Sequence, residues 1–372
     1  MHEQISGLLS PGPPVGPPHA CSYLKDIRSV DAAAMEEARR IQNSLTKPKG
    51  SLGRLEDLSI QLAGIYRTPS PEIRRKMVFT IAADHGVVAE GVSAYPSEVT
   101  AQMVLNFARG GAAINVLTRH VGAEVRVVDM GVDSDMKWPE CIVACKVAKG
   151  TKNITKGPAM SGSQLHNAIE KGADLAMKAI DSGVNAVAIG DMGIGNTTAA
   201  SAITAVITDT PVRDVTGRGT GIDDKSLEAK IGVIEKAIRV NSPNPCNGFD
   251  VLRKVGGLEI AGMTGVVLGS ASKGVPVFID GFVSCSAALA AFVIAPNCRD
   301  YLIASHKSVE PGHRYALEHL DLAPLLDLGM RLGEGTGAAL AFLIAEASCK
   351  ILNEMATFEG AGVSRSLREG KK

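Results

Sequence analysis

The chain has 372 residues, with 39 basic and 39 acidic side chains, so its formal net charge is zero. Hydrophobic residues make up 45% of the chain and glycines number 40, which is typical of a folded α/β protein and excludes a disordered one. No run of like charge is long enough to bind a polyanion, so we expect no nucleic acid partner.

The first 21 residues are predicted to be a flexible leader. They contain five prolines and lack the basic segment and apolar segment of a secretory signal. Further along, the stretch of small apolar residues at 282–296 is too short to cross a bilayer. We therefore expect no membrane partner.

Two helices are predicted next, at residues 30–46 and 55–65. From about Met77, short β-branched runs alternate with Ala-rich helical runs, which indicates βαβ units and a parallel sheet. The strands are predicted at residues 78–82, 125–128, 186–189, 275–279 and 301–304.

The predicted strands end alike, in a polar residue that usually has a glycine beside it. These residues are Asp84, Asp129, Asp191, Asp280 and Ser305. The carboxyl ends of parallel strands share one edge of the sheet, where ligands bind. Asp and Gly also end strands where no ligand binds, but five repeats favour a shared ligand-binding edge.

The cysteines and histidines show no metal-ligand pattern. The seven cysteines are scattered and odd in number, as expected of reduced thiols in a cytoplasmic protein. Cys141 and Cys145 form the only close pair and have no second pair nearby. We predict neither a metal nor a cofactor.

A glycine-rich turn, GDMGIGNTT at residues 190–198, follows a predicted strand and precedes an Ala-rich helix. Gly193 and Gly195 let backbone amides face outward and Asn196 or Thr197 can cap the helix, which makes a cradle for a phosphate. The spacing fits neither a Walker A loop nor a dinucleotide fingerprint. The alternative that this segment is only a tight βα turn, with no ligand, remains open.

Three later features also suit an anion. Arg218 and Gly219 lie in a second glycine-rich turn, inside a stretch at 209–227 that is predicted to be a long loop. Lys230 opens the next helical stretch, where it can bind an anionic substrate or stay solvated. Residues 305–314, with Gly312 ahead of a helix, offer another amide-presenting corner.

Glu334 stands between glycines just ahead of an apolar segment of helical periodicity at residues 338–355. Thr336 or Gly337 can cap that helix, so Glu334 lies where the chain enters it. A carboxylate near helix-terminal N–H groups is held ionised, which suits a proton acceptor. A first-turn glutamate beside flexible glycines is the simpler interpretation of this motif alone.

Several segments together resemble the nicotinate-nucleotide–dimethylbenzimidazole phosphoribosyltransferase family over roughly residues 24–356. They are KPKGSLGRLE at 47–56, ADHGV at 83–87, GDMGIGNTT at 190–198, VGG at 255–257, GMTG at 262–265, DGF at 280–282 and MRLGEG at 330–335.

The resemblance implies a Rossmann-like, mostly parallel sheet flanked by helices, with a small helical domain formed by both chain ends, and a homodimer. We accordingly expect a leader (1–21), helices of the small domain (22–75), a catalytic domain (76–335), and a C-terminal helix with a tail (336–372). The implied reaction transfers phosphoribose from nicotinate mononucleotide to 5,6-dimethylbenzimidazole. Inversion at C1′ gives α-ribazole 5′-phosphate and nicotinate.

The resemblance also implies roles for residues. Glu334 matches the family's general base, and Lys230 lines the active site together with Asp191, which replaces the family's usual, longer Glu. We expect the phosphate and ribose at Gly193, Gly195, Asn196, Thr197, Arg218, Gly219, Asp280, Ser305 and Gly312. We expect the base pocket at Asp84, Tyr95, Gln102 and Leu332.

Two alternatives stay open at this point. One is a relative that uses the same donor with a different lower-ligand base, which the pocket around Tyr95 would decide. The other is a nucleotide-binding regulator without turnover. The intact Glu334 motif argues against a regulator, and the Asp191 substitution is the one feature in its favour.

Overall fold

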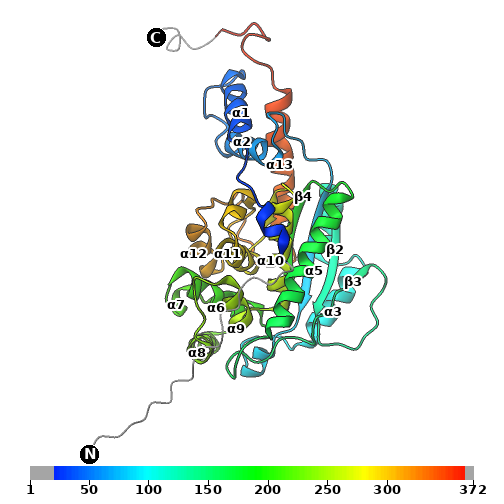
Figure 1. Ribbon diagram of the computed structural model, residues 1–372, viewed down its shortest axis with the longest axis vertical. Helices are drawn as coiled ribbons and strands as arrows, with labels where there is room; N and C mark the ends of the chain where they lie inside the picture. Colours follow the sequence, from blue (N-terminus) through cyan, green and yellow to red (C-terminus); the bar gives the residue numbers. More distant parts are fainter. Residues whose placement is uncertain (1–20, 365–372) are drawn as a thin grey trace, which may run out of the picture.

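A six-stranded, all-parallel sheet forms the centre of the protein, in the order β3-β2-β1-β4-β5-β6 (Figure 1). The computed structural model describes residues 21–364. This strand order is that of a doubly wound Rossmann sheet, so the predicted α/β fold class is confirmed. The strands are β1 (Lys76–Ala83), β2 (Glu124–Gly131), β3 (Ile142–Ala144), β4 (Ala186–Met192), β5 (Val277–Ile279) and β6 (Leu302–Ala304).

Helices connect the strands and cover the sheet. The α-helices are α1 (Ala32–Ser44), α2 (Arg54–Tyr66), α3 (Glu98–Ala108), α4 (Ala113–Val121), α5 (Gly162–Asp181), α6 (Asn196–Thr208), α7 (Val212–Val215), α8 (Asp224–Asn241), α9 (Gly248–Val255), α10 (Leu258–Ser272), α11 (Phe282–Ile294), α12 (Pro311–His319) and α13 (Thr336–Glu354). Short 3₁₀ helices are η1 (Ser22–Asp26), η2 (Gly86–Glu90) and η3 (Pro296–Tyr301).

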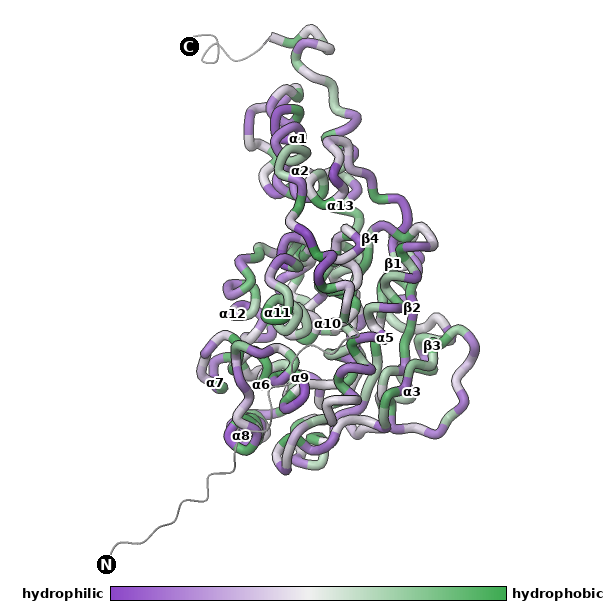
Figure 2. The backbone as a smooth tube through the Cα atoms, viewed as in Figure 1, coloured by the Kyte–Doolittle hydropathy of each residue, from purple (hydrophilic) through white to green (hydrophobic). Residues whose placement is uncertain are grey.

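Strand β1 is buried along its whole length, because helices cover both faces of the sheet. Side chains alternate along a strand. Val78 accordingly packs beside Gly335 and Ile114 on the α4 and α13 side, whereas Ile81 packs beside Gly262 of α10. The hydrophobic segments gather in the strands and in α11, as Figure 2 shows.

Glycines let α5 and α10 cross at close range. A Cβ atom on Gly172 would lie 2.0 Å from the carbonyl oxygen of Gly262, and one on Gly265 would lie 2.0 Å from that of Ile169. The glycines of the GMTG segment therefore allow α10 to pack closely against α5. This packing accounts for the GMTG motif without a catalytic role.

Helices α1, α2 and α13 pack together at one end of the molecule (Figure 1). Their contact buries a small cluster of Ala38, Ile60, Ala63 and Leu352, separate from the main core. We propose that this is the small domain built from both chain ends. Of the predicted leader only Cys21 is described, and it is buried and bonded to Glu170; residues 1–20 and 365–372 lie outside the described range.

Some boundaries differ from the sequence prediction. The three-residue edge strand β3 was not expected, because its short apolar run stands beside cysteines without a strand-length pattern. The predicted long loop at 209–227 contains the short helix α7 and the start of α8. Asp223 caps α8 by accepting a hydrogen bond from Ser226 N, so Lys230 lies inside that helix instead of opening it.

Helix α13 is also the one helix in the described part of the chain that is long and apolar enough to cross a membrane. Its apolar window is 56% buried, against α2, α4 and the sheet. A core helix of a folded protein meets the same criterion.

Candidate active site

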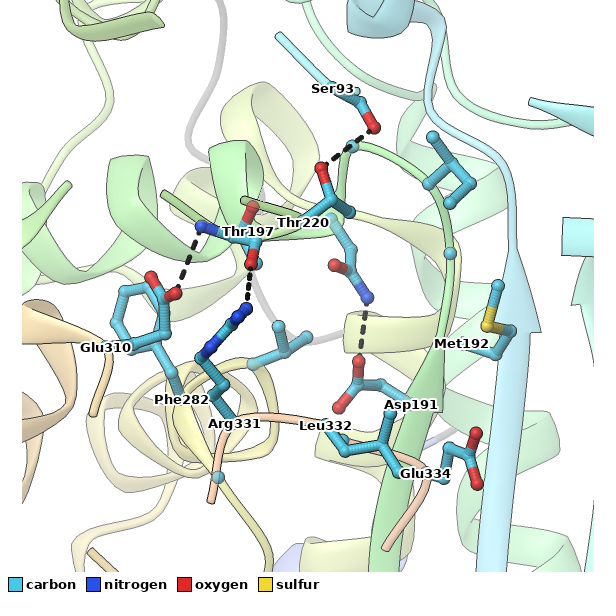
Figure 3. Close-up of a pocket in the computed structure, with 18 of the residues that line it drawn as sticks. Ser93, Asp191, Met192, Thr197, Thr220, Phe282, Glu310, Arg331, Leu332 and Glu334 are labelled. Atoms are coloured by element: carbon cyan, nitrogen blue, oxygen red, sulfur yellow. Dashed lines mark hydrogen bonds between the residues drawn. The ribbon is translucent and has the colours of Figure 1, made fainter. Parts of the chain in front are cut away.

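A pocket of about 420 Å³ opens at the carboxyl ends of the strands, and Figure 3 shows the side chains around it. Its walls come from residues 92–103 after β1, 191–197 at the end of β4, 219–220, 281–283, 306–310 and 331–334. Strands β1 and β4 are neighbours whose connections run to opposite sides of the sheet. Ligands bind at such a switch point in doubly wound folds.

The backbone of Glu334 is fixed on the floor of this pocket. Its N–H donates to the carbonyl oxygen of Asp191 (3.1 Å), and its carbonyl oxygen accepts from Thr80 Oγ1 (2.7 Å). A Cβ atom on Gly190 would lie 2.2 Å from Gly335 N, so only glycine in β4 allows this approach. Glu334 has φ of +64°, a left-handed conformation that is strained for a glutamate and typical of functional sites.

The carboxylate of Glu334 is bound at a helix start, but the helix is α4 and not α13. Its Oε2 accepts a hydrogen bond from Ile114 N (3.1 Å), while Oε1 has no hydrogen-bond partner within residues 21–364. Burial raises the pKa of Glu334, the bond from Ile114 lowers it, and the negative Asp280 raises it further. The net direction is upward, the reverse of the sequence expectation, and it makes the carboxylate a stronger base.

Asp191 lies beside Glu334 at the end of β4 and also lines the pocket (Figure 3). Its Oδ2 accepts from Asn196 Nδ2 (2.8 Å). Burial raises the pKa of Asp191 to about 8, and the negative charges of Asp280, Glu259 and Glu334 add to this effect. The charges of Asp280, Glu259 and Glu334 create a negative field that favours positive charge in the pocket.

Asp280 is fully buried and supports the chain from Glu334 into α13. Its carboxylate accepts hydrogen bonds from Gly335 N (3.1 Å), Gly337 N (2.7 Å) and Ala338 N (3.1 Å). The predicted caps Thr336 and Gly337 are instead the first residues of α13, and Gly335 is its N-cap. Asp280 therefore anchors the start of α13 and does not line the pocket, where ribose contact was expected.

The glycine-rich turn after β4 forms one wall of the pocket, from Gly193 and Gly195 to Asn196 and Thr197. Gly195 is the N-cap of α6, where Asn196 or Thr197 was expected. Thr197 Oγ1 accepts a hydrogen bond from Lys230 Nζ (2.8 Å). The amides at the helix start and this ammonium group make a site of positive potential.

Lys230 is only 1% exposed, which rules out the solvated alternative. Its Nζ also donates to the carbonyl oxygen of Gly217 (3.2 Å), so it joins the α6 start to the loop at 217–221. Burial lowers the pKa of Lys230 to about 8, against the opposite effect of Glu310. Lys230 is not among the residues that line the pocket, but its hydrogen bonds hold two lining segments, the start of α6 at Thr197 and the loop at 217–221.

The loop at 217–221 spans the pocket mouth. Gly219 donates its N–H to Glu310 Oε1 (3.0 Å), and its carbonyl oxygen accepts from Arg331 (3.0 Å). Thr220 Oγ1 accepts from Ala94 N (3.1 Å) on the opposite rim. Arg218 instead points away from the pocket, where it binds Asp224 and the carbonyl oxygen of Ile222, so the structure does not place it for phosphate contact.

The residues expected at the base pocket divide into two groups. Tyr95 and Leu332 flank the opening and are 53% and 58% exposed. Gln102 is exposed on α3 outside the pocket, where its neighbours Val99 and Met103 line the wall instead. Asp84 is buried behind the pocket and accepts from Asp133 N (2.7 Å).

Ser305 and Gly312 also lie outside the pocket. Ser305 is fully buried at the end of β6, and its N–H donates to the carbonyl oxygen of Ile279. Gly312 is in the first turn of α12, and a Cβ atom there would lie 2.5 Å from the Phe282 ring. Gly312 therefore permits close packing of α12 on α11.

Of the pocket residues that were not singled out from the sequence, three have charged or titratable side chains: His306, Glu310 and Arg331. His306 Nε2 lies 3.5 Å from Asp280 Oδ1, and this contact favours the charged imidazole and raises the pKa of His306 against the effect of burial. Within residues 21–364, no group of three or more His, Cys, Asp or Glu side chains is placed to hold a metal ion.

Comparison with known proteins agrees with this geometry. A family model described as phosphoribosyltransferase matches residues 27–363. The chain is 58% identical over 341 residues to the nicotinate-nucleotide–dimethylbenzimidazole phosphoribosyltransferase of Chloroflexus aggregans, covering 92% of this chain and 97% of that protein. It is 57% identical to that of Roseiflexus sp., over 91% and 96% of the two chains.

A solved structure gives the same result. The crystal structure of the protein of that name from Thermus thermophilus superposes with a TM-score of 0.86 at 44% identity. The match covers 90% of this chain and 100% of the solved chain.

Proposed function

Because the chain belongs to the nicotinate-nucleotide–dimethylbenzimidazole phosphoribosyltransferase family, we propose how its pocket performs the transfer, with Glu334 as general base and inversion at C1′. The protein is a pentosyltransferase that moves phosphoribose from nicotinate mononucleotide to 5,6-dimethylbenzimidazole. A benzimidazole nitrogen attacks C1′ from the face opposite nicotinate. The C1′–N bond breaks and its electron pair neutralises the pyridinium, while the acceptor's N–H proton passes to Glu334.

The observation that carries this proposal is the placement of Glu334. Its backbone is held by Asp191 and Thr80, and its Oε2 is held by Ile114. Its Oε1 has no hydrogen-bond partner among residues 21–364, and Glu334 lines the pocket. A base must be positioned as well as basic, and the raised pKa of Glu334 supplies the basicity. The N–H of the acceptor becomes acidic as its other nitrogen bonds to C1′, so a carboxylate suffices.

The negative field supports the other half of the mechanism. Positive charge builds on the ribose ring as nicotinate leaves, and Asp191, Asp280 and Glu334 lie where they favour it. The bound cation in turn lowers the pKa of Asp191, so that its carboxylate ionises when the substrate is in place.

The remaining groups of the substrates suit the other walls. The start of α6 and Lys230 present N–H groups and a positive charge to the phosphate of the donor. Val99, Met103 and Tyr95 offer an apolar surface to the flat acceptor. We propose this division of the pocket as the binding mode of the two substrates.

We also propose a cytoplasmic homodimer. Helices α4 and α13, which pack together, carry the exposed apolar side chains of Val116 and Leu343, which are 52% and 38% exposed. A partner surface would cover them. All seven cysteines are free thiols, which suits a reducing compartment.

The direct test is an assay of the purified protein with nicotinate mononucleotide and 5,6-dimethylbenzimidazole, without added metal. We expect nicotinate release by chromatography together with the α-riboside, identified by NMR of the anomeric proton. A β-riboside would overturn the inversion, and release of nicotinate without any riboside would overturn the transfer to this acceptor.

The raised pKa of Glu334 gives a prediction about pH. We expect its carboxyl to titrate above the ordinary value of 4.5, and the base to be lost as pH falls through that raised pKa. The measurement is ¹³C NMR of protein labelled at the glutamate side-chain carboxyl, with Glu334→Gln identifying the signal. A signal that titrates at or below 4.5 contradicts the raised pKa.

A further inference from the structure

Thr100 is a fully buried polar residue in the first turn of α3, and the reaction described above gives it no role. It does not line the pocket, but its neighbours on the helix, Val99 and Met103, do. Its Oγ1 accepts a hydrogen bond from Ile194 N (3.1 Å), and Ile194 lines the pocket within the glycine-rich turn after β4. Thr100 therefore joins two segments of the pocket wall that lie 94 residues apart in the sequence.

One hydrogen bond holds the glycine-rich turn against α3. Within the turn, Asn196 N donates to the carbonyl oxygen of Gly193 (3.1 Å), so the turn keeps its own shape. Among residues 21–364, the bond from Ile194 to Thr100 is the only hydrogen bond between α3 and the turn at 193–198. A change at Thr100 therefore acts on the distance between the turn and α3 and leaves the bonds inside the turn in place.

The hydroxyl of Thr100 also lies within reach of the buried carboxyl group of Asp84, the residue that follows β1. Burial raises the pKa of Asp84, and the N–H of Asp133 and the hydroxyl of Thr100 oppose that effect. A hydroxyl is both an acceptor and a donor, so Thr100 can accept from Ile194 while its hydrogen points toward Asp84. Valine has nearly the same shape but can make neither contact.

The two joined segments belong to different substrates in the binding mode proposed above. The acceptor wall, Val99 and Met103 of α3, offers its surface to the benzimidazole. The donor wall, the turn at 193–197, leads into the α6 start and its phosphate site. Bond formation needs the acceptor nitrogen at C1′, on the face opposite nicotinate. The distance between the two walls therefore sets how well the bound acceptor is aimed at the bound donor.

Resting on the proposed function, we propose that Thr100 is a positioning residue for the transfer. Its hydroxyl fixes the spacing between the acceptor wall and the donor wall, and it touches neither substrate. Without the hydroxyl, the amide of Ile194 is left unpaired in a buried place, so the walls shift until that amide finds another partner. Each substrate still finds its own wall, but the reacting atoms are held in poorer alignment.

The test compares Thr100→Val, which keeps the side-chain shape, with Thr100→Ser, which keeps the hydroxyl. Thr264→Val is the matched control, because Thr264 is also fully buried and hydrogen-bonded but lies on α10, outside the pocket. Each chain is measured in three ways. They are the single-turnover rate of α-riboside formation with both substrates saturating, the affinity for nicotinate mononucleotide by calorimetry, and the free energy of unfolding in a denaturant titration.

We expect Thr100→Val to lower the single-turnover rate about tenfold to hundredfold, because a misplacement of about 1 Å costs a factor of that order. Its affinity for nicotinate mononucleotide should stay at the wild-type value. Thr100→Ser should restore most of the rate, and Thr264→Val should lose stability but keep the wild-type rate. If Thr100→Val does not fold, Thr100→Ala lacks the same hydroxyl and carries the same expectation.

A wild-type rate in the folded Thr100→Val or Thr100→Ala chain would overturn the proposal. A rate in Thr100→Ser as low as in Thr100→Val would assign Thr100 to packing alone, and so would a loss of donor affinity as large as the loss of rate. The wild-type chain decides the proposed function separately. If it forms no α-riboside, the proposed transfer fails, whereas a wild-type chain that turns over beside an unaffected Thr100→Val removes only the role of Thr100.

Discussion

Replacing Glu334 by glutamine is expected to abolish almost all turnover and to leave the binding of nicotinate mononucleotide intact. A positioned base contributes roughly 10²- to 10⁴-fold to the rate, and glutamine cannot take a proton from the acceptor. The amide oxygen can still accept from Ile114 N, and the backbone bonds to Asp191 and Thr80 are unchanged. The fall should therefore appear in kcat and not in the affinity for the donor.

Single-turnover release of nicotinate, measured beside donor binding by calorimetry, checks this. Glu354→Gln is the control, because Glu354 is exposed at the other end of α13. Wild-type turnover in Glu334→Gln would reject Glu334 as the base, and Asp191 would become the next candidate. Weakened donor binding with an unchanged rate would assign Glu334 to substrate binding instead.

The fold was largely predictable because its signals are local. A strand buried on both faces is a continuous apolar run, as in β1, and the polar residue that ends it marks the ligand-binding edge. The α/β class and the parallel sheet follow from that pattern. The edge strand β3 has only three residues, too few to stand out from a loop.

The site was predictable only where a residue stands in a distinctive local motif. Glu334 and Asp191 lie between glycines, which drew attention to them. Glu310 stands in no such motif, and its partner Gly219 lies 91 residues away. The residue that binds the Glu334 carboxylate, Ile114 in the first turn of α4, lies 220 residues earlier, so spacing along the chain suggested the wrong helix.

Contacts between residues far apart in the sequence also determine the pKa values of Lys230 and Glu334. Lys230 is buried because α8 packs against α6 and the loop at 217–221. The residues next to Lys230 in the sequence do not predict these contacts. The upward direction of the Glu334 pKa likewise comes from burial and from Asp280, which follows β5 and lies 54 residues away in the sequence. Sequence motifs can name an acid, but its protonation depends on which other acids the fold brings beside it.

Asp280→Asn is expected to destabilise the protein and to shift the ionisation of Asp191 and Glu334. The carboxylate of Asp280 satisfies N–H groups of Gly335, Gly337 and Ala338 at the start of α13. Asparagine offers one acceptor oxygen and turns a donor toward at least one of these groups. An unsatisfied buried group costs about 1–3 kcal/mol, and the lost charge at the helix start adds roughly 0.3–1 kcal/mol.

We therefore expect the free energy of unfolding to fall by about 1–4 kcal/mol, the sum of those two ranges, in a denaturant titration. Asp223→Asn is a matched control, since Asp223 caps α8 on the surface and asparagine caps a helix equally well. An Asp280→Asn protein as stable as wild type would show that the carboxylate does not anchor α13.

Ionisation gives the second readout of Asp280→Asn. The negative charge of Asp280 raises the pKa of both Asp191 and Glu334, so its removal should lower both. The Glu334 signal in ¹³C NMR should then titrate at lower pH than in wild type, and turnover should persist to lower pH. A variant that is destabilised but keeps the wild-type titration would confine Asp280 to a structural role. A lower free energy of unfolding together with a lower Glu334 pKa would show that the Asp280 carboxylate both anchors the start of α13 and raises the basicity of Glu334.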